Sequence, residues 1–150
     1  MITISLSPPK VGRNFGTISF ASTLYLCPIL DLLLVEVPEQ WHAELRLGLQ
    51  EALVNAAKHG NNLDPSKIVI VRFFLANDHY WWAISDEGRG FAPPCHHHTG
   101  PAHLLPSEES ESGRGLCILH KIFDQVQWNA NGTELKLGKK NQRFRLPLVS

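Results

Sequence analysis

Three short polar motifs interrupt the mostly apolar second half of the sequence, and they constrain the fold more than any other feature. They are Glu51–Gly60, Asp86–Gly90 and Gly113–Leu116. The first lies at the end of a predicted helix, the second follows a predicted strand, and the third precedes another predicted helix. In this order they predict the parts of a nucleotide pocket: an acid and an amide facing inward from a helix, an acid at a strand end, and a glycine loop at a helix start.

The first motif belongs to a helix that we expect to begin at Pro38, whose fixed φ suits the first helical position. Residues 60–62 should end this helix with a left-handed turn. Glu51, Asn55 and His59 are four residues apart, so we expect them to stack along one stripe at the border of the apolar face. That face is predicted from apolar residues at three- and four-residue steps: Trp41, Leu45, Leu49, Ala52, Leu53 and Ala56.

A carboxylate and an amide at the edge of a core are costly unless something pairs with them. Asn55 offers a carbonyl oxygen to a hard cation such as Mg²⁺, which keeps waters and phosphate oxygens among its ligands. Glu51 could take a proton from a hydroxyl or water that attacks a phosphate, and Lys58 could reach a phosphate. The alternative for this motif alone is an amphipathic helix with a polar border.

The second motif follows a strand and enters a loop. Asp86 could accept a hydrogen bond from an exocyclic amine, which would select adenine. Gly88 and Gly90 would let the backbone approach the base or sugar without clashes from a β-carbon. The alternative is an Asp-Gly turn that closes a strand, which is common.

The third motif places two glycines before a helix. Gly113 and Gly115 would leave the first N–H groups of that helix exposed, which makes an anion site for phosphates. Arg114 could balance phosphate charge or could be a surface arginine. The alternative for the motif is a simple N-terminal turn.

The remaining sequence predicts strands and helices in one α+β layer. Strands at 68–75 and 79–85 form a hairpin, a helix spans 116–126, and three antiparallel strands follow at 126–130, 133–137 and 143–149, with a turn at 138–141. A loop is expected at 11–17, and Ser22 should cap an early helix with Pro28 in its first turns or at a kink. The predicted fold class is therefore α+β, a two-layer sandwich with a mixed, mostly antiparallel sheet and helices on one face.

Length and charge exclude several classes of protein. The 150 residues suit one domain, 1–150, with its core at about 18–148. Lys plus Arg equals Asp plus Glu at 14 each, so we expect no nucleic acid partner held by bulk charge. No apolar run reaches the ~20 residues that span a bilayer, which argues against a membrane protein. The 3 cysteines form neither a disulfide framework nor a zinc pattern, and a cytoplasmic location is expected.

Taken together, the motifs resemble those of a known superfamily. Glu51-x-x-x-Asn55-Ala56-x-x-His59, Asp86-x-Gly88-x-Gly90 and Gly113-x-Gly115-Leu116 look like the N, G1 and G2 boxes of the GHKL ATPases and kinases. Within that superfamily, the chain is similar to the anti-sigma factor serine/threonine kinases. The similarity rests on its short length, on the lack of a visible phosphoacceptor helix pair and on the amino-acid sequence of residues 49–59. The resemblance covers about residues 18–148.

The resemblance implies a left-handed βαβ sandwich of the Bergerat type, with a lid over the nucleotide at about 92–112. Asn55 would hold Mg²⁺, Glu51 would be the catalytic base, and Asp86 would bind the adenine amine of ATP. Thr133 would support Asp86 through a water. The remaining nucleotide-binding residues would be Lys58, His59, Gly88, Gly90, Gly113, Arg114, Gly115 and Leu116.

The resemblance also implies partners. The favoured hypothesis is an ATP- and Mg²⁺-dependent kinase that phosphorylates an anti-anti-sigma antagonist of the STAS type and sequesters a sigma factor. Such proteins often form homodimers. The alternative is a nucleotide-gated binding module of the same fold without kinase activity, suggested by an unusual lid that contains Cys95, His96, His97, His98 and His103. Three adjacent histidines cannot all face one metal ion, so we expect this run to be solvated.

Overall fold

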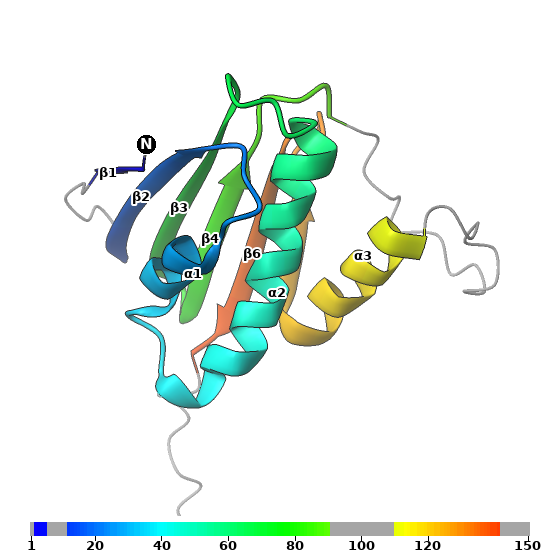
Figure 1. Ribbon diagram of the computed structural model, residues 1–150. Coiled ribbons are helices and arrows are strands. Elements are labelled where there is room, and N and C mark those ends of the chain that lie inside the picture. The colour runs from blue at the N-terminus through cyan, green and yellow to red at the C-terminus, as the bar shows by residue number, and fades with distance from the viewer. Residues whose placement is uncertain (1, 6–11, 91–109, 142–150) are drawn as a thin grey trace, which may run out of the picture.

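The computed structural model describes residues 2–5, 12–90 and 110–141. In this part of the chain, six strands and three α-helices form two layers (Figure 1). The strands are β1 (Thr3–Ser5), β2 (Arg13–Ala21), β3 (Ile68–Ala76), β4 (His79–Ser85), β5 (Gln125–Trp128) and β6 (Glu134–Lys140). The helices are α1 (Cys27–Leu34), α2 (His42–Val54) and α3 (Ser110–Ile122). A 3-10 turn, Glu39–Trp41, leads into α2, and a π-helical segment, Asn55–Gly60, extends it.

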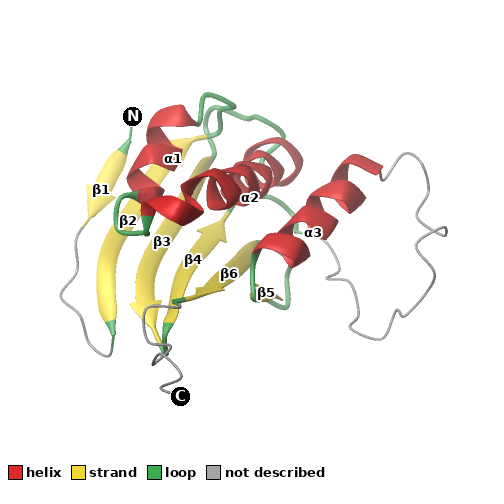
Figure 2. Ribbon diagram, turned by 90° about the horizontal axis from the view of Figure 1, so that it is seen from below, coloured by secondary structure: helices red, strands yellow, loops and turns green. Residues whose placement is uncertain are grey.

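The sheet has the strand order β1-β2-β3-β4-β6-β5, and every neighbouring pair is antiparallel. All three helices lie on one face of it, with α2 between α1 and α3 (Figure 2). The predicted α+β sandwich is therefore confirmed, and among the described strands the sheet is antiparallel throughout. The predicted hairpin is confirmed as well, because Asn77 and Asp78 both take positive φ between β3 and β4.

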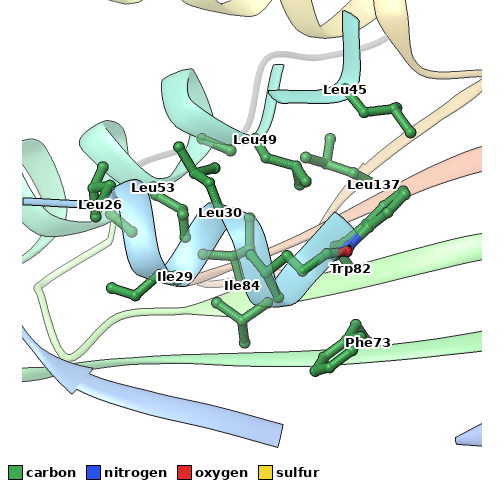
Figure 3. Packing of buried hydrophobic residues seen from close by; sticks show 14 of the residues in the cluster. Leu26, Ile29, Leu30, Leu45, Leu49, Leu53, Phe73, Trp82, Ile84 and Leu137 are labelled. Atoms are coloured by element: carbon green, nitrogen blue, oxygen red, sulfur yellow. The ribbon is translucent and has the colours of Figure 1, made fainter. Parts of the chain in front are cut away.

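One apolar core lies between the helices and the sheet. Leu45, Leu49 and Leu53 of α2 are 0% exposed, as the four-residue spacing predicts. They belong to the same buried cluster as Trp82 of β4 (Figure 3). The indole nitrogen of Trp82 donates to the backbone oxygen of Leu33 at 3.2 Å. The buried residues of α2 thus hold the helix across the middle of the sheet. This packing also determines where the C-terminal end of α2 lies.

Two sequence predictions for the strands were wrong. Residues 11–17 were expected to form a loop, yet Arg13–Ala21 forms β2 and pairs with β3. The strand accommodates these residues through a register shift between Asn14 and Gly16. The turn expected at 138–141 lies partly inside β6, which continues to Lys140 because Gly138 pairs with Trp81 of β4. The strand predicted at 143–149 lies outside the described residues.

The early helix also differs from the prediction. Ser22 does not cap α1, which begins at Cys27 with Leu26 in the cap position. Pro28 is in its first turn, the place where proline is tolerated. The hydroxyl of Ser22 instead donates to the backbone oxygen of Lys67 at 2.9 Å, so it joins the end of β2 to the start of β3.

Candidate functional site

The first polar motif spans the end of α2 and the π-helical segment that follows. Glu51 lies in the last turns of α2 and Asn55 begins the π-helical segment; both are half-buried. The backbone N–H of Asn61 donates to Ala56 O at 2.9 Å, five residues earlier, which is the π-helical pattern. Because this turn is wider than that of an α-helix, the four-residue stripe predicted for Glu51, Asn55 and His59 does not continue to His59, which is exposed.

The third motif begins differently from the prediction. The helix α3 starts at Ser110 rather than at Leu116, so Gly113–Leu116 lies inside the helix and does not form a loop before it. Each helical glycine costs about 1 kcal/mol relative to alanine. Burial of Leu119 and Ile122 offsets that cost, and Leu116 packs against the same core. The side chain of Arg114 lies outside the described part of the structure.

Gly115 brings the third motif against the first. A methyl group at this position would lie 3.3 Å from Glu51 Oε2 and 3.4 Å from Asn55 Nδ2. The helix α3 therefore presents bare backbone to the carboxylate and the carboxamide. This is a small cradle that a side chain at position 115 would fill.

The second motif meets the other end of the first. Asp86 directly follows β4, as predicted, and its N–H donates to Thr133 O at 3.0 Å. Its Oδ1 accepts the N–H of Gly88 at 2.8 Å. A β-carbon at Gly60 would clash with the Asp86 carboxylate, and one at Gly88 would clash with the carbonyl oxygen of Gly60. The two glycines therefore allow the acid to lie against the end of the helix.

Burial raises the pKa of Asp86 above its ordinary value of 3.8. The hydrogen bond from the N–H of Gly88 and the charge of Lys67 act in the opposite direction and are smaller. A partly desolvated carboxylate is costly when nothing pairs with it, and such groups gather at binding sites. Asp86 is therefore suited to bind a hydrogen-bond donor from a ligand.

Gly90 and Thr133 border the same loop. Gly90 has φ +75, which favours glycine, and a β-carbon there would clash with Asn131 O. The Thr133 hydroxyl accepts a hydrogen bond from Asn129 Nδ2 at 3.1 Å, and Asn129 Oδ1 accepts the Thr133 N–H at 2.9 Å. Asn129 thus orients the residue whose backbone oxygen binds Asp86. The sequence analysis did not identify Asn129; its place four residues before Thr133, at a turn, was the available signal.

Asn61 is the second residue that the sequence analysis missed. It was expected only to help end the helix, which Asn62 does with φ 55. The side chain of Asn61 is 0% exposed and its Oδ1 accepts the N–H of Glu87 at 2.7 Å. An asparagine after a helix-ending glycine gives no sign by itself that its side chain turns inward.

The site therefore lies along one segment of backbone. Glu51, Asn55 and Gly115 gather at its beginning, and Asp86 lies against its last residue, Gly60. At ~1.5 Å per residue, the five steps from Asn55 to Gly60 correspond to a rise of about 7.5 Å along the helix axis. Lys58 and His59 are exposed between them. A carboxylate and an amide oxygen at one end suit a magnesium-bound phosphate chain, and an acid at the other suits an amine donor.

Two predicted features fall outside the described residues. Residues 92–109 of the expected lid do so, and with them Cys95, His96–His98 and His103. Residues 110–112 of that lid belong to α3. Within 2–5, 12–90 and 110–141, no group of three or more histidine, cysteine or acidic side chains could hold a metal ion. Across those same ranges, every helix is too short or too polar to cross a bilayer.

Comparison with known proteins identifies the family of this chain. The histidine kinase-like ATPase domain family matches residues 31–139. An anti-sigma F factor of Geobacillus kaustophilus is 30% identical over 124 residues, which are 82% of this chain and 78% of that protein. The serine-protein kinase RsbW of Oceanobacillus iheyensis is 30% identical over 89 residues, 57% of this chain and 56% of the kinase.

A third relative, an anti-sigma F factor of Clostridium perfringens, is 25% identical over 100 residues, 65% of this chain and 71% of that protein. These matches confirm the resemblance inferred from the three motifs. The chain belongs to the histidine kinase-like ATPase domain family, in the group that contains the anti-sigma F factors.

Proposed function

We propose that this protein is an anti-sigma factor with ATP- and Mg²⁺-dependent serine/threonine kinase activity. It would phosphorylate an anti-anti-sigma antagonist of the STAS type and sequester a sigma factor. The observation that carries the proposal is that the second and third motifs both lie against the helix end formed by the first motif. Gly115 lies beside Glu51 and Asn55, while Asp86 lies against Gly60.

Each end of the site would have its own task. Asp86 would accept the exocyclic amine of adenine, with Gly88 and Gly90 beside the base. Glu51 would accept the proton of the attacking serine hydroxyl, while the serine oxygen bonds to the γ-phosphorus and ADP leaves with the electrons of the broken P–O bond. Thr133 would support Asp86, whose N–H already donates to its backbone oxygen.

The residues present fit a magnesium ion. The carboxamide of Asn55 is half-buried and its Nδ2 lies beside Gly115, while its Oδ1 would serve as the hard oxygen ligand. The ion would need few further protein ligands because phosphate oxygens and waters complete its shell. When bound, it would neutralise charge on the phosphates. Lys58 and His59, exposed along the same segment, would add positive or hydrogen-bonding groups near the phosphate chain.

Further parts of the proposal concern the whole molecule. We infer one domain, 1–150, with a lid at about 92–112 that closes over the nucleotide, where Gly113, Arg114 and Leu116 of α3 would adjoin the phosphates. A cytoplasmic location and a homodimer belong to the same proposal.

Binding and transfer are tested separately. The melting temperature should rise with Mg-ATP and Mg-ADP but not with Mg-GTP, because only a ligand that binds the native state stabilises it. Transfer from γ-labelled ATP to a purified STAS-type antagonist should then yield phosphoserine. If Mg-ATP raises the melting temperature but no phosphoserine forms, the kinase hypothesis is rejected and the alternative of a nucleotide-gated binding module remains.

The assigned base has a matched control on the same helix. Glu51→Gln should lower the transfer rate by at least about 100-fold while Mg-ATP binding persists, since general-base catalysis contributes on that scale. Glu44→Gln should leave both unchanged, because Glu44 is exposed and makes only a 3.4 Å ion pair with Lys139. Normal transfer by Glu51→Gln would show that another group takes the proton.

A further inference from the structure

The buried carboxamide of Asn61 joins three separate elements. Its Nδ2 donates to Ile68 O of β3 at 2.9 Å and to Ser22 Oγ after β2 at 2.9 Å. Its Oδ1 accepts the N–H of Glu87, in the loop after β4, at 2.7 Å. A backbone donor and a backbone acceptor flank it, so only one orientation of the amide satisfies both.

A second hydrogen bond closes this network from outside. The carboxylate of Glu87 accepts the N–H of Ile68 at 2.7 Å. Ile68 therefore gives its carbonyl oxygen to Asn61 and its N–H to Glu87, while Glu87 gives its own N–H back to Asn61. The three residues form a closed ring that ties the loop after β4 to the start of β3 and to the end of the helical segment.

This ring acts on the residue next to Glu87. The backbone N–H of Asp86 donates to Thr133 O, and the carboxylate of Asp86 lies against Gly60. Gly60 is adjacent to Asn61 in sequence, as Asp86 is to Glu87. The single bond between Asn61 and Glu87 therefore clamps the two backbone segments that bring Gly60 and Asp86 together.

We propose that Asn61 is a positioning residue for base recognition. It holds the Asp86 carboxylate against the helix end, and the Glu87 carboxylate completes the clamp. This inference rests on the proposed adenine site and adds the residues that set its geometry. It makes a separable statement about the two ends of the site, because the hydrogen bonds of the Asn61 side chain go to Ser22, Ile68 and Glu87.

Three variants test the clamp. Asn61→Asp keeps the shape but replaces the donor that faces Ile68 O with an acceptor, so it should open the ring. Glu87→Ala removes the outer bond from an exposed residue, which leaves the core untouched. Glu87→Gln keeps the carbonyl oxygen that accepts the Ile68 N–H and is the conservative control. Circular dichroism first establishes a temperature at which each variant is folded.

Binding is then measured by calorimetry with Mg-ADP, Mg-GDP and Mg-pyrophosphate. Asn61→Asp should lower the affinity for Mg-ADP by about 10-fold or more, and it should reduce the preference for Mg-ADP over Mg-GDP. Mg-pyrophosphate, which probes only the phosphate end, should bind as in the wild type. Glu87→Ala should also reduce the ratio of the affinities for Mg-ADP and Mg-GDP. Glu87→Gln should keep this ratio close to the wild-type value.

The possible failures are distinct. Equal weakening of all three ligands by a folded Asn61→Asp protein would mean a merely structural role and would overturn the inference. So would an unchanged ADP/GDP ratio in both Asn61→Asp and Glu87→Ala. A wild-type protein that binds none of the three would overturn the proposed function, and the inference with it.

Discussion

The substitution of glycine by alanine should have opposite effects on stability at two helical positions of this protein. Gly115 is inside α3 and Gly48 is inside α2. Alanine is better than glycine in a helix interior by about 0.8–1.0 kcal/mol at either position. The difference comes from what the new methyl group would meet, and the structure gives those distances.

At position 115 the methyl group would fit tightly, against flexible side chains only. Its nearest neighbours would be Glu51 Oε2 at 3.3 Å and Asn55 Nδ2 at 3.4 Å, both on side chains that can shift by a few tenths of an ångström. Most of the gain in helix propensity should survive. We expect Gly115→Ala to raise the free energy of unfolding by about 0.5–1 kcal/mol, which corresponds to roughly 1–4 °C in melting temperature.

At position 48 the methyl group would lie 2.6 Å from Cε2 of Phe123, a ring that is 4% exposed in the core. Overpacking of this kind costs about 1–3 kcal/mol, which exceeds the gain in propensity. Gly48→Ala should therefore melt at a lower temperature than the wild type. Differential scanning fluorimetry without nucleotide compares the three proteins directly.

The same methyl group at position 115 would occupy the cradle beside Glu51 and Asn55. Gly115→Ala should therefore be more stable alone but gain less stability from Mg-ATP. Cys117→Ala, exposed on the same helix, controls for helix propensity and should respond to Mg-ATP as the wild type does. A Gly115→Ala protein with the full Mg-ATP response would refute the placement of phosphates beside this glycine.

Three further predictions concern stability. Leu49→Ala should lower the free energy of unfolding in urea by about 2–5 kcal/mol, because Leu49 is 0% exposed; a loss below about 1 kcal/mol would contradict its place in the core. Gly90→Ala should be destabilised by its φ of +75 and by Asn131 O, and a melting temperature equal to the wild type would mean that the turn adapts. The raised pKa of Asp86 gives stabilisation that is complete below 3.8 and is lost as the pH rises through the folded-state value. Asp86→Asn cannot ionise, so its free energy of unfolding in urea titrations should rise relative to that of the wild type as the pH increases above 3.8, and a difference that does not change with pH would show that the pKa of Asp86 is not raised in the folded protein.

The strongest periodic segments could be predicted from sequence. The face of α2 formed by Leu45, Leu49 and Leu53 was predicted because one period repeats over several turns and the core then satisfies it. The limits of β4, His79–Ser85, were also predicted, because two apolar runs flank a turn that was expected at 76–78 and signals a hairpin. Local patterns of this kind need no knowledge of what packs on them.

Segments whose structure depends on distant partners could not be predicted. Arg13–Ala21 contains turn-forming residues, and its pairing with β3 overrides that preference. The start of α3 was placed too late because two glycines disfavour a helix locally, while burial of Leu119 decides the outcome. Likewise, the sequence places Asn61 at a helix end, but only the fold brings Glu87 to its carboxamide.

The arrangement of the site explains why its two ends can be tested independently. Asn55 and Gly60 belong to one continuous helical segment, so their separation is set by backbone hydrogen bonds and not by the closure of a loop. Asp86 joins this segment at Gly60, whereas Gly115 joins it beside Asn55. A change at either junction should therefore move the group proposed to recognise the ligand there without moving the other. Base selectivity and phosphate affinity should accordingly vary separately among the variants, and a joint loss would indicate that the helical segment itself had shifted.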